Sequence, residues 1–162
     1  FKIQELFEKK NILNDKIIVS CPFSGRVDAI WPIENYREAY KKIIHKDYYI
    51  FVTGNESEFS IAKDAFDDLG PQVINICGQL SILELALLFQ KSKIYFGNDT
   101  GPMHLASLVR IPCVAIFSST NNPGKFYPHN ENNIIYQVKN NLKEIKVSNV
   151  VDGIMEAIEN NN

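Results

Sequence analysis

Residues 97–104, GNDTGPMH, place an acid, a hydroxyl, a glycine and a histidine where an apolar run ends and a helical pattern begins. The first turn of a helix has free N–H groups and a partial positive charge, so it can bind a phosphate group. Gly101 would let a phosphate approach the backbone, and Thr100 would add a hydroxyl donor. Asp99 would repel phosphate, which leaves it as the helix N-cap or as a contact to another part of a ligand. His104 either reaches the same ligand or packs under the loop.

A second group of polar residues, GNESE at residues 54–58, follows another apolar run. A carboxylate after the second strand of a nucleotide-binding sheet can accept both hydroxyls of a ribose, and Glu58 is a candidate for that role. The alternative is that the acids of this segment only complement the dipole of the helix that follows. Ser24, Gly25 and Arg26 follow the first apolar run and complete the set of candidate ligand contacts.

The predicted strands are six short apolar runs, rich in β-branched and aromatic residues, at 17–23, 48–53, 73–77, 94–96, 113–117 and 134–138. The predicted helices between and after them are at 34–45, 56–69, 81–92, 101–110 and 147–160. Because several runs are apolar at successive positions, we expect these strands to be covered on both faces. The alternation predicts an α/β fold, a three-layer, Rossmann-like, doubly wound parallel sheet. Such sheets bind ligands at the carboxyl ends of their strands, so the candidate residues should meet there.

The length of 162 residues indicates a single domain over 1–162. The chain starts at Phe1, inside a helical pattern, so we expect a fragment of a longer protein with a linker helix over 1–15. The net charge is −2 at pH 7 and the sequence contains no basic stripe, which argues against a nucleic-acid partner. No apolar stretch reaches the ~20 residues of a transmembrane helix.

Three cysteines, Cys21, Cys77 and Cys113, lie singly inside apolar runs. Their spacing is not that of metal ligands, so we expect buried thiols in a reducing compartment and no bound metal. The sequence also lacks GxGxxG, the P-loop pattern and GxSxG, which disfavours NAD-dependent enzymes, P-loop NTPases and α/β-hydrolases. A flavodoxin-like or receiver domain is disfavoured because no acid cluster follows the first predicted strand.

Together these motifs resemble the signature of glycosyltransferase family 9, the ADP-heptose:lipopolysaccharide heptosyltransferases. Residues 97–121, GNDTGPMHLASLVRIPCVAIFSSTN, match its pattern in order, except that Ser118 stands where the family has glycine. The upstream segments that also match are Trp31-Pro32, Gly54 with Glu58, and GQLSILELA at 78–86. The likeness covers about residues 16–138, and four motifs in the right order are far more specific than any one of them.

The resemblance implies a two-domain GT-B enzyme of which this chain is the C-terminal, donor-binding half, whereas the N-terminal acceptor domain is absent. It implies inverting transfer of a sugar, without a metal or other cofactor, from a nucleotide sugar for which ADP-heptose is the leading candidate. The expected role is lipopolysaccharide or related surface glycan synthesis. Because the family's general base lies in the N-terminal domain, we expect this fragment to bind nucleotide but not to catalyse transfer alone.

The resemblance also assigns roles to the candidate residues. Glu58 would hold the adenosine ribose. Asp99 would approach the donor sugar or organise the loop, which resolves its awkward position beside a phosphate site. The residues implied to line the donor site are Ser24, Gly25, Arg26, Glu58, Asp99, Thr100, Gly101 and His104, with Ser24, Gly25, Thr100 and Gly101 near the diphosphate.

One departure from the family pattern concerns charge. Family members carry a basic residue two places before the Trp-Pro pair, and Ala29 occupies that place here. Arg26 is the candidate substitute, with a solvated loop charge as the alternative. The polar loop 119–133, which includes Lys125, Tyr127 and His129, could close over the donor or be an ordinary surface loop.

The expected partners are an ADP-linked sugar and, through the missing domain, a glycolipid acceptor. The expected location is the cytoplasm, including peripheral association with the inner face of the membrane. Two alternatives remain open: a nucleotide-sugar-binding module that has lost catalysis, for which Ala29 is the clue, and a nucleotide-sugar epimerase of GT-B architecture.

Overall fold

A computed structural model describes Phe7, Ile12 and residues 16–120, 125, 127–128, 132–138 and 141–161 of the chain. Most of the predicted linker helix at 1–15, and much of the 119–133 loop with His129, lie outside these residues. None of the helices in the described part of the chain has the length and hydrophobicity of a transmembrane segment.

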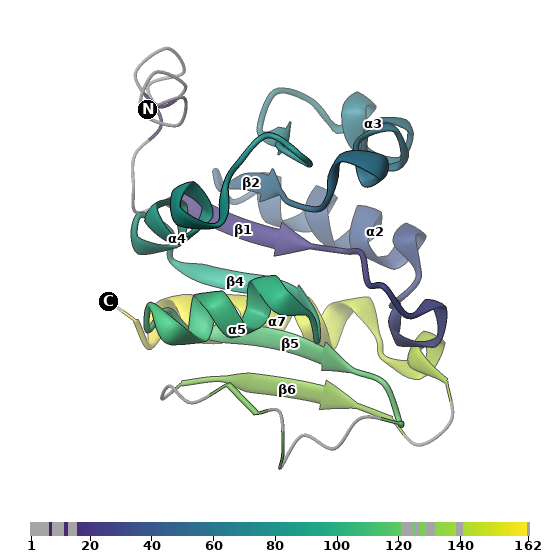
Figure 1. Ribbon diagram of the computed structural model, residues 1–162. Coiled ribbons are helices and arrows are strands. Elements are labelled where there is room, and N and C mark those ends of the chain that lie inside the picture. The colour runs from purple at the N-terminus through teal and green to yellow at the C-terminus, as the bar shows by residue number, and fades with distance from the viewer. Residues whose placement is uncertain are drawn as a thin grey trace.

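Six parallel strands in the described residues form one sheet, in the order β3-β2-β1-β4-β5-β6 (Figure 1). The strands are β1 (Ile17–Cys21), β2 (Tyr49–Val52), β3 (Val73–Asn75), β4 (Ile94–Asn98), β5 (Cys113–Phe117) and β6 (Ile134–Gln137). Each predicted apolar run contains one of these strands, apart from small differences at the ends. The order changes direction between β1 and β4, so the sheet is doubly wound as predicted, and ligands of such sheets bind at this point.

Helices cover both faces of the sheet (Figure 1). The α-helices are α2 (Ile33–Ile44), α3 (Phe59–Phe66), α4 (Ile82–Gln90), α5 (Gly101–Leu108) and α7 (Val147–Glu159). The short 3-10 helices are η2 (Val27–Ala29), η3 (Glu56–Glu58), η4 (Asp67–Leu69) and η5 (Leu142–Glu144). The predicted helix over 56–69 is therefore three consecutive segments, η3, α3 and η4, and it ends at Gly70, whose φ of 103° favours glycine.

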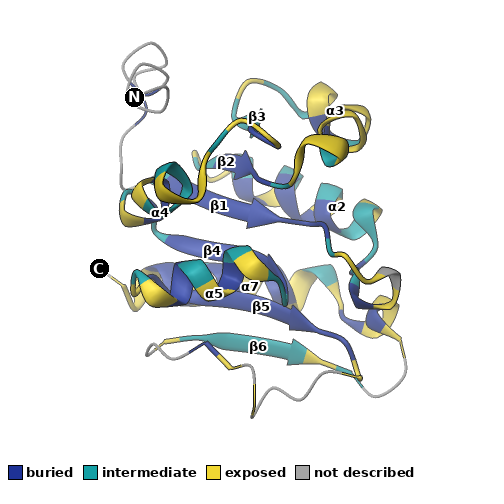
Figure 2. Cartoon of the chain, in the orientation of Figure 1, coloured by how far each residue is buried: buried dark blue, intermediate teal, exposed yellow. Residues whose placement is uncertain are grey.

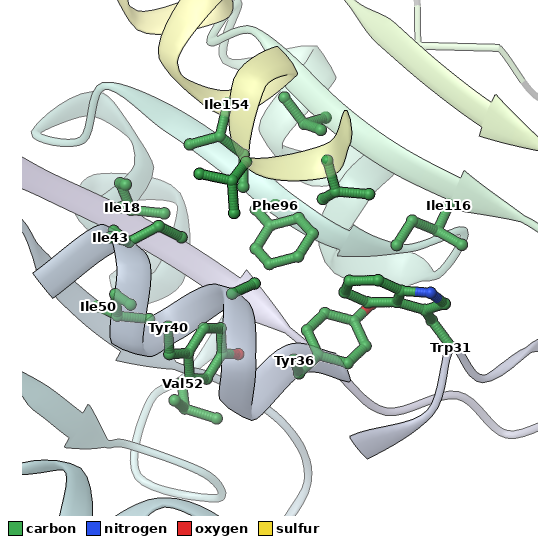
Figure 3. Packing of buried hydrophobic residues seen from close by; sticks show 14 of the residues in the cluster. Ile18, Trp31, Tyr36, Tyr40, Ile43, Ile50, Val52, Phe96, Ile116 and Ile154 are labelled. Carbon is green, nitrogen blue, oxygen red and sulfur yellow. The ribbon is translucent and has the colours of Figure 1, made fainter. Parts of the chain in front are cut away.

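The hydrophobic core has two layers, one on each face of the sheet. One layer packs α2, α3 and α7 on the sheet and contains Trp31, Tyr36 and Phe96, whose rings lie against one another (Figure 3). The other layer packs α4 and α5, together with Phe7, whose ring meets that of Phe51 edge-on at 5.6 Å between centroids. Every residue of β1, β4 and β5 is buried, as the continuous apolar runs indicated (Figure 2).

Candidate functional site

A cleft of about 320 Å³ opens at the carboxyl ends of β1 and β2, beside the start of α5. Its lining comes from four segments that are far apart in the sequence. The lining residues are Cys21, Phe23, Ser24, Gly25, Thr53, Gly54, Asn55, Glu58, Leu80, Ser81, Ile82, Leu85, Thr100 and Pro102. Four of the eight predicted site residues, Ser24, Gly25, Glu58 and Thr100, are therefore brought together, and the volume lies at the low end for small-molecule sites.

Glu58 is held in place by a capping box with Asn55. The Glu58 Oε2 atom accepts the Asn55 N–H at 2.7 Å, and Asn55 Oδ1 accepts the Glu58 N–H at 3.1 Å. The carboxylate therefore stabilises the first turn of η3, and the same half-buried side chain lines the cleft. The two interpretations of Glu58, a helix-end acid and a cleft acid, are compatible in this geometry.

Gly54 allows the Glu58 carboxylate to lie against the end of β2. A Cβ atom at Gly54 would lie 2.5 Å from Glu58 Oε2, 2.9 Å from the Phe23 ring and 3.1 Å from Cys77 Sγ. Real Cβ atoms do not approach other heavy atoms that closely, so a side chain here would displace the carboxylate or the ring. Glycine at position 54 thus has a steric reason, because it leaves room for the carboxylate of Glu58 four residues later.

Thr100 is the N-cap of α5, and its backbone is extended with φ −147° and ψ 173°. The Thr100 hydroxyl makes no capping bond, whereas the Thr100 carbonyl accepts the Met103 N–H at 3.0 Å. Pro102 has no N–H group, so the helix end directs fewer donors outward than the sequence pattern implied. Gly101 begins the helix, and no heavy atom outside its immediate neighbours lies within 4 Å of where its Cβ would be.

Asp99 is not the N-cap, because the helix begins at Gly101 and Thr100 occupies the capping position. The Asp99 side chain is 6% exposed, and its Oδ1 atom lies 3.5 Å from Nε2 of His104. The His104 side chain is 45% exposed, so it does not pack under the loop. Both residues lie at the start of α5, but neither is among the residues that line the cleft.

Arg26 lies outside the cleft lining. Its guanidinium donates to Asp28 Oδ2 at 2.7 Å and to Thr120 Oγ1, and the hydrogen bond from Arg26, helped by its positive charge, lowers the pKa of the Asp28 carboxyl. Ala29, where the family has a basic residue, is only 2% exposed in η2. No Lys or Arg is among the described residues that line the cleft, whose single ionisable carboxylate belongs to Glu58.

The apolar side of the cleft is formed by Leu80, Ile82 and Leu85 around the start of α4. Ile82 is 77% exposed, although an isoleucine in an apolar helix pattern is usually buried. The helix begins at a capping box in which Ser81 Oγ accepts the Glu84 N–H at 3.3 Å. Sequence reasoning did not assign this side of the cleft, because these residues are indistinguishable from core positions in a one-dimensional pattern.

The three cysteines are buried thiols outside any disulfide, as expected. Cys21 is among the residues that line the cleft. Burial raises the pKa of Cys21 to about 11 and that of Cys77 to about 12. Both thiols are therefore protonated at neutral pH and poor nucleophiles. Among the described residues, no group of three or more His, Cys, Asp or Glu side chains is arranged to hold a metal ion.

The fold and the cleft define a Rossmann-like domain with a polar site at the switch point of its sheet, the architecture of one half of a GT-B glycosyltransferase. The profile of glycosyltransferase family 9 (heptosyltransferase) matches residues 2–154, so the chain belongs to this family. The resemblance of the sequence motifs is thereby confirmed.

Known proteins of this kind are similar over most of the chain. Lipopolysaccharide heptosyltransferase 1 of Campylobacter coli is 29% identical over 141 residues, which cover 83% of this chain and 41% of that protein. The structure of E. coli ADP-heptose lps heptosyltransferase II superposes with a TM-score of 0.86 at 18% identity, covering 97% of this chain and 51% of that one. The E. coli heptosyltransferase WaaC with ADP gives a TM-score of 0.80 at 22% identity, covering 92% and 47%. The chain thus spans about half of the length of these relatives or somewhat less.

Proposed function

We propose that the cleft binds the ADP part of an ADP-linked sugar and that the chain is the donor-binding half of an inverting glycosyltransferase. The observation that carries the proposal is the meeting of Glu58 and Thr100 in one cleft, although 42 positions separate them in the sequence. Glu58 would serve as the ribose acceptor and Thr100 as a phosphate donor, on the two sides of the switch point. Family membership supports sugar transfer, and relatives named as heptosyltransferases support heptose as the sugar.

Each part of the nucleotide has a candidate partner in the cleft or, for Gly101, directly beside it. The Glu58 carboxylate would accept the ribose hydroxyls, while Thr100, Gly101, Ser24 and Gly25 would contact the diphosphate through hydroxyl and N–H groups. The base would lie against the apolar residues Leu80, Ile82 and Leu85. Binding of a flat apolar ring there would cover side chains that are otherwise exposed to water.

The negative charge of a diphosphate would meet no positively charged side chain in the described lining of the cleft. The cleft lining supplies no cation, and Ala29 cannot supply one, so Arg26 is the nearest candidate in the sequence. We propose that Arg26 leaves its contact with Asp28 and binds the diphosphate when the donor enters. Hydrogen bonds and the α5 dipole would then stabilise the departing ADP without a metal ion.

Asp99 and His104 would face the donor sugar from the start of α5. The acceptor would be a glycolipid held by a further domain, and that domain would supply the general base, so this chain alone would bind the donor without transferring it. Two alternatives share the same cleft: a binding module that has lost catalysis, which the uncharged Ala29 favours, and an epimerase of GT-B architecture. Membership in glycosyltransferase family 9 favours transfer over epimerisation.

Calorimetric titration of the 162-residue chain with ADP, adenosine and UDP tests the proposal. We expect ADP to bind more tightly than UDP, and Glu58→Gln to weaken ADP and adenosine equally, by about tenfold, since one charged hydrogen-bond acceptor for the ribose is lost. Glutamine preserves the capping box, and Glu56→Gln in the same turn is the matched control because Glu56 does not line the cleft. Absence of nucleotide binding at millimolar concentrations would contradict the proposal. A sugar-transfer assay on a two-domain form would separate the active enzyme from the lapsed module.

A further inference from the structure

Asn98 is the last residue of β4, and its side chain is completely buried. Its Oδ1 atom accepts the Trp31 N–H at 3.1 Å and the Tyr36 hydroxyl at 2.9 Å. Its Nδ2 atom donates to the Pro22 carbonyl at 2.9 Å. These bonds join the end of β4 to the chain that leaves β1 and to the start of α2, across 62 to 76 positions of sequence.

The main chain of Asn98 is hydrogen-bonded within its own strand and to the segment that leads into α5. Its carbonyl accepts the Tyr95 hydroxyl at 2.8 Å and the Thr100 hydroxyl at 3.4 Å, and the two hydroxyls are themselves 3.4 Å apart. A Cβ atom at Gly97 would collide with the Tyr95 hydroxyl, so glycine at that position leaves room for this contact. Asn98 therefore contacts both segments that lead into the proposed phosphate site.

The sheet itself does not fix these two segments relative to each other. The pairing of β1 with β4 ends at Cys21 and Gly97, where β1 itself ends, while β4 continues for one residue to Asn98, which pairs with Ile116 of β5. The Asn98 amide to the Pro22 carbonyl is a cross-connection immediately beyond that last pair. Ser24 follows two residues later on one chain, and Thr100 follows two residues later on the other.

We infer that Asn98 is a positioning residue that holds the Ser24–Gly25 and Thr100–Gly101 segments at a fixed separation, so that they bind a diphosphate without rearrangement. The inference rests on the proposed function of the cleft. Asparagine suits this position because one side chain both accepts two bonds and donates another in a buried place. An aspartate would keep the shape and the acceptors but could not, when ionised, donate to the Pro22 carbonyl.

The test compares the affinity for ADP with the affinity for adenosine in three variants, measured by NMR titration, which reaches millimolar dissociation constants. We expect Asn98→Asp and Tyr95→Phe each to weaken ADP by about tenfold and to leave adenosine unchanged, because only the phosphate contacts depend on the two segments. Tyr40→Phe is the matched control. It removes an equally buried hydroxyl, which donates to Ser20 Oγ at 2.7 Å, away from the cleft lining.

The outcomes separate the inference from the proposed function. An unchanged ratio of ADP to adenosine affinity in Tyr95→Phe and Asn98→Asp would overturn the role of Asn98 while leaving the nucleotide cleft intact. Equal losses in Tyr40→Phe would show that general destabilisation is responsible and would also overturn it. If Asn98→Asp does not fold, Tyr36→Phe replaces it, since it deletes a single hydroxyl that donates to Asn98 Oδ1, and an unchanged ratio of the two affinities in Tyr36→Phe would then overturn the inference. A wild-type chain that binds neither ligand would overturn the proposed function itself.

Discussion

Replacing Gly54 by alanine should damage both stability and nucleotide binding. The added Cβ would lie 2.5 Å from Glu58 Oε2, 2.9 Å from the Phe23 ring and 3.1 Å from Cys77 Sγ, so at least one of these groups must move. The carboxylate is the most mobile of the three, and its displacement breaks the 2.7 Å bond to the Asn55 N–H. Overpacking of this kind costs about 1–3 kcal/mol, and loss of a helix cap costs about 1 kcal/mol.

We therefore expect Gly54→Ala to lower the free energy of unfolding by about 2–3 kcal/mol, which corresponds to a fall in Tm of about 5–10 °C for a domain of this size. The affinity for ADP should fall by about tenfold, because the displaced Glu58 carboxylate no longer meets the ribose. Urea denaturation measures the first effect and calorimetric titration the second.

The control for the stability measurement is Gly25→Ala. No heavy atom lies within 4 Å of the Cβ that this change would add, so the free energy of unfolding should stay within about 0.5 kcal/mol of wild type. The reasoning is refuted if Gly54→Ala is as stable as Gly25→Ala and binds ADP with wild-type affinity. It is also wrong if Gly54→Ala loses stability but retains full affinity, because Glu58 would then not be the ribose contact.

Two further predictions concern charge. Arg26→Gln should weaken the binding of ADP severalfold without affecting the binding of adenosine. Asp28→Asn should strengthen the binding of ADP, since it removes the carboxylate that competes with the diphosphate for Arg26. Calorimetry at low and high salt checks both predictions, and unchanged affinities in both variants would exclude Arg26 from the site. Burial raises the pKa of Cys21 from 9.0 to about 11, so the unfolded chain loses this proton first and the stabilising contribution of the neutral thiol disappears as pH rises from 9 to 11. The expected loss in the free energy of unfolding is on the order of 3 kcal/mol. Denaturant titrations at several pH values should show that this free energy falls less steeply with pH in Cys21→Ala than in wild type; equal dependence on pH would argue against this burial effect.

The strands were predictable because each begins with apolar β-branched or aromatic residues or lies within an apolar run, and continuous runs such as CVAIF at 113–117 are typical of a sheet covered on both faces. The helix boundaries were less accurate. The predicted helix over 56–69 contains 3-10 turns at both ends, because Asn55 and Glu58 form a local capping box that favours a tight first turn and the segment η4 precedes Gly70. Local side-chain bonds of this kind compete with regular helix geometry.

The site was only partly predictable, because some of its contacts depend on residues far apart in the sequence. Glu58 and Thr100 follow strands, and parallel strands end at one edge, so their meeting in one cleft follows from the fold. The orientation of Arg26 toward Asp28 and Thr120 is set by contacts up to 94 positions away, which no local pattern encodes. The same applies to Asn98, whose buried bonds depend on the tertiary fold, although it follows an apolar run in the sequence.

The contact of Phe7 with Phe51 determines how far the chain can be truncated from its N-terminus without loss of stability. Phe7 is only 8% exposed and belongs to the same apolar layer as α4 and α5, so it is part of the packed body that supports the cleft floor. A recombinant version that began after residue 12 would expose the Phe51 ring. Its free energy of unfolding would be lower by the ~1.5–3 kcal/mol that burying one phenylalanine side chain contributes. Losses of solubility or ligand affinity in such a shortened chain would then result from the missing Phe7 side chain rather than from a change in the nucleotide contacts.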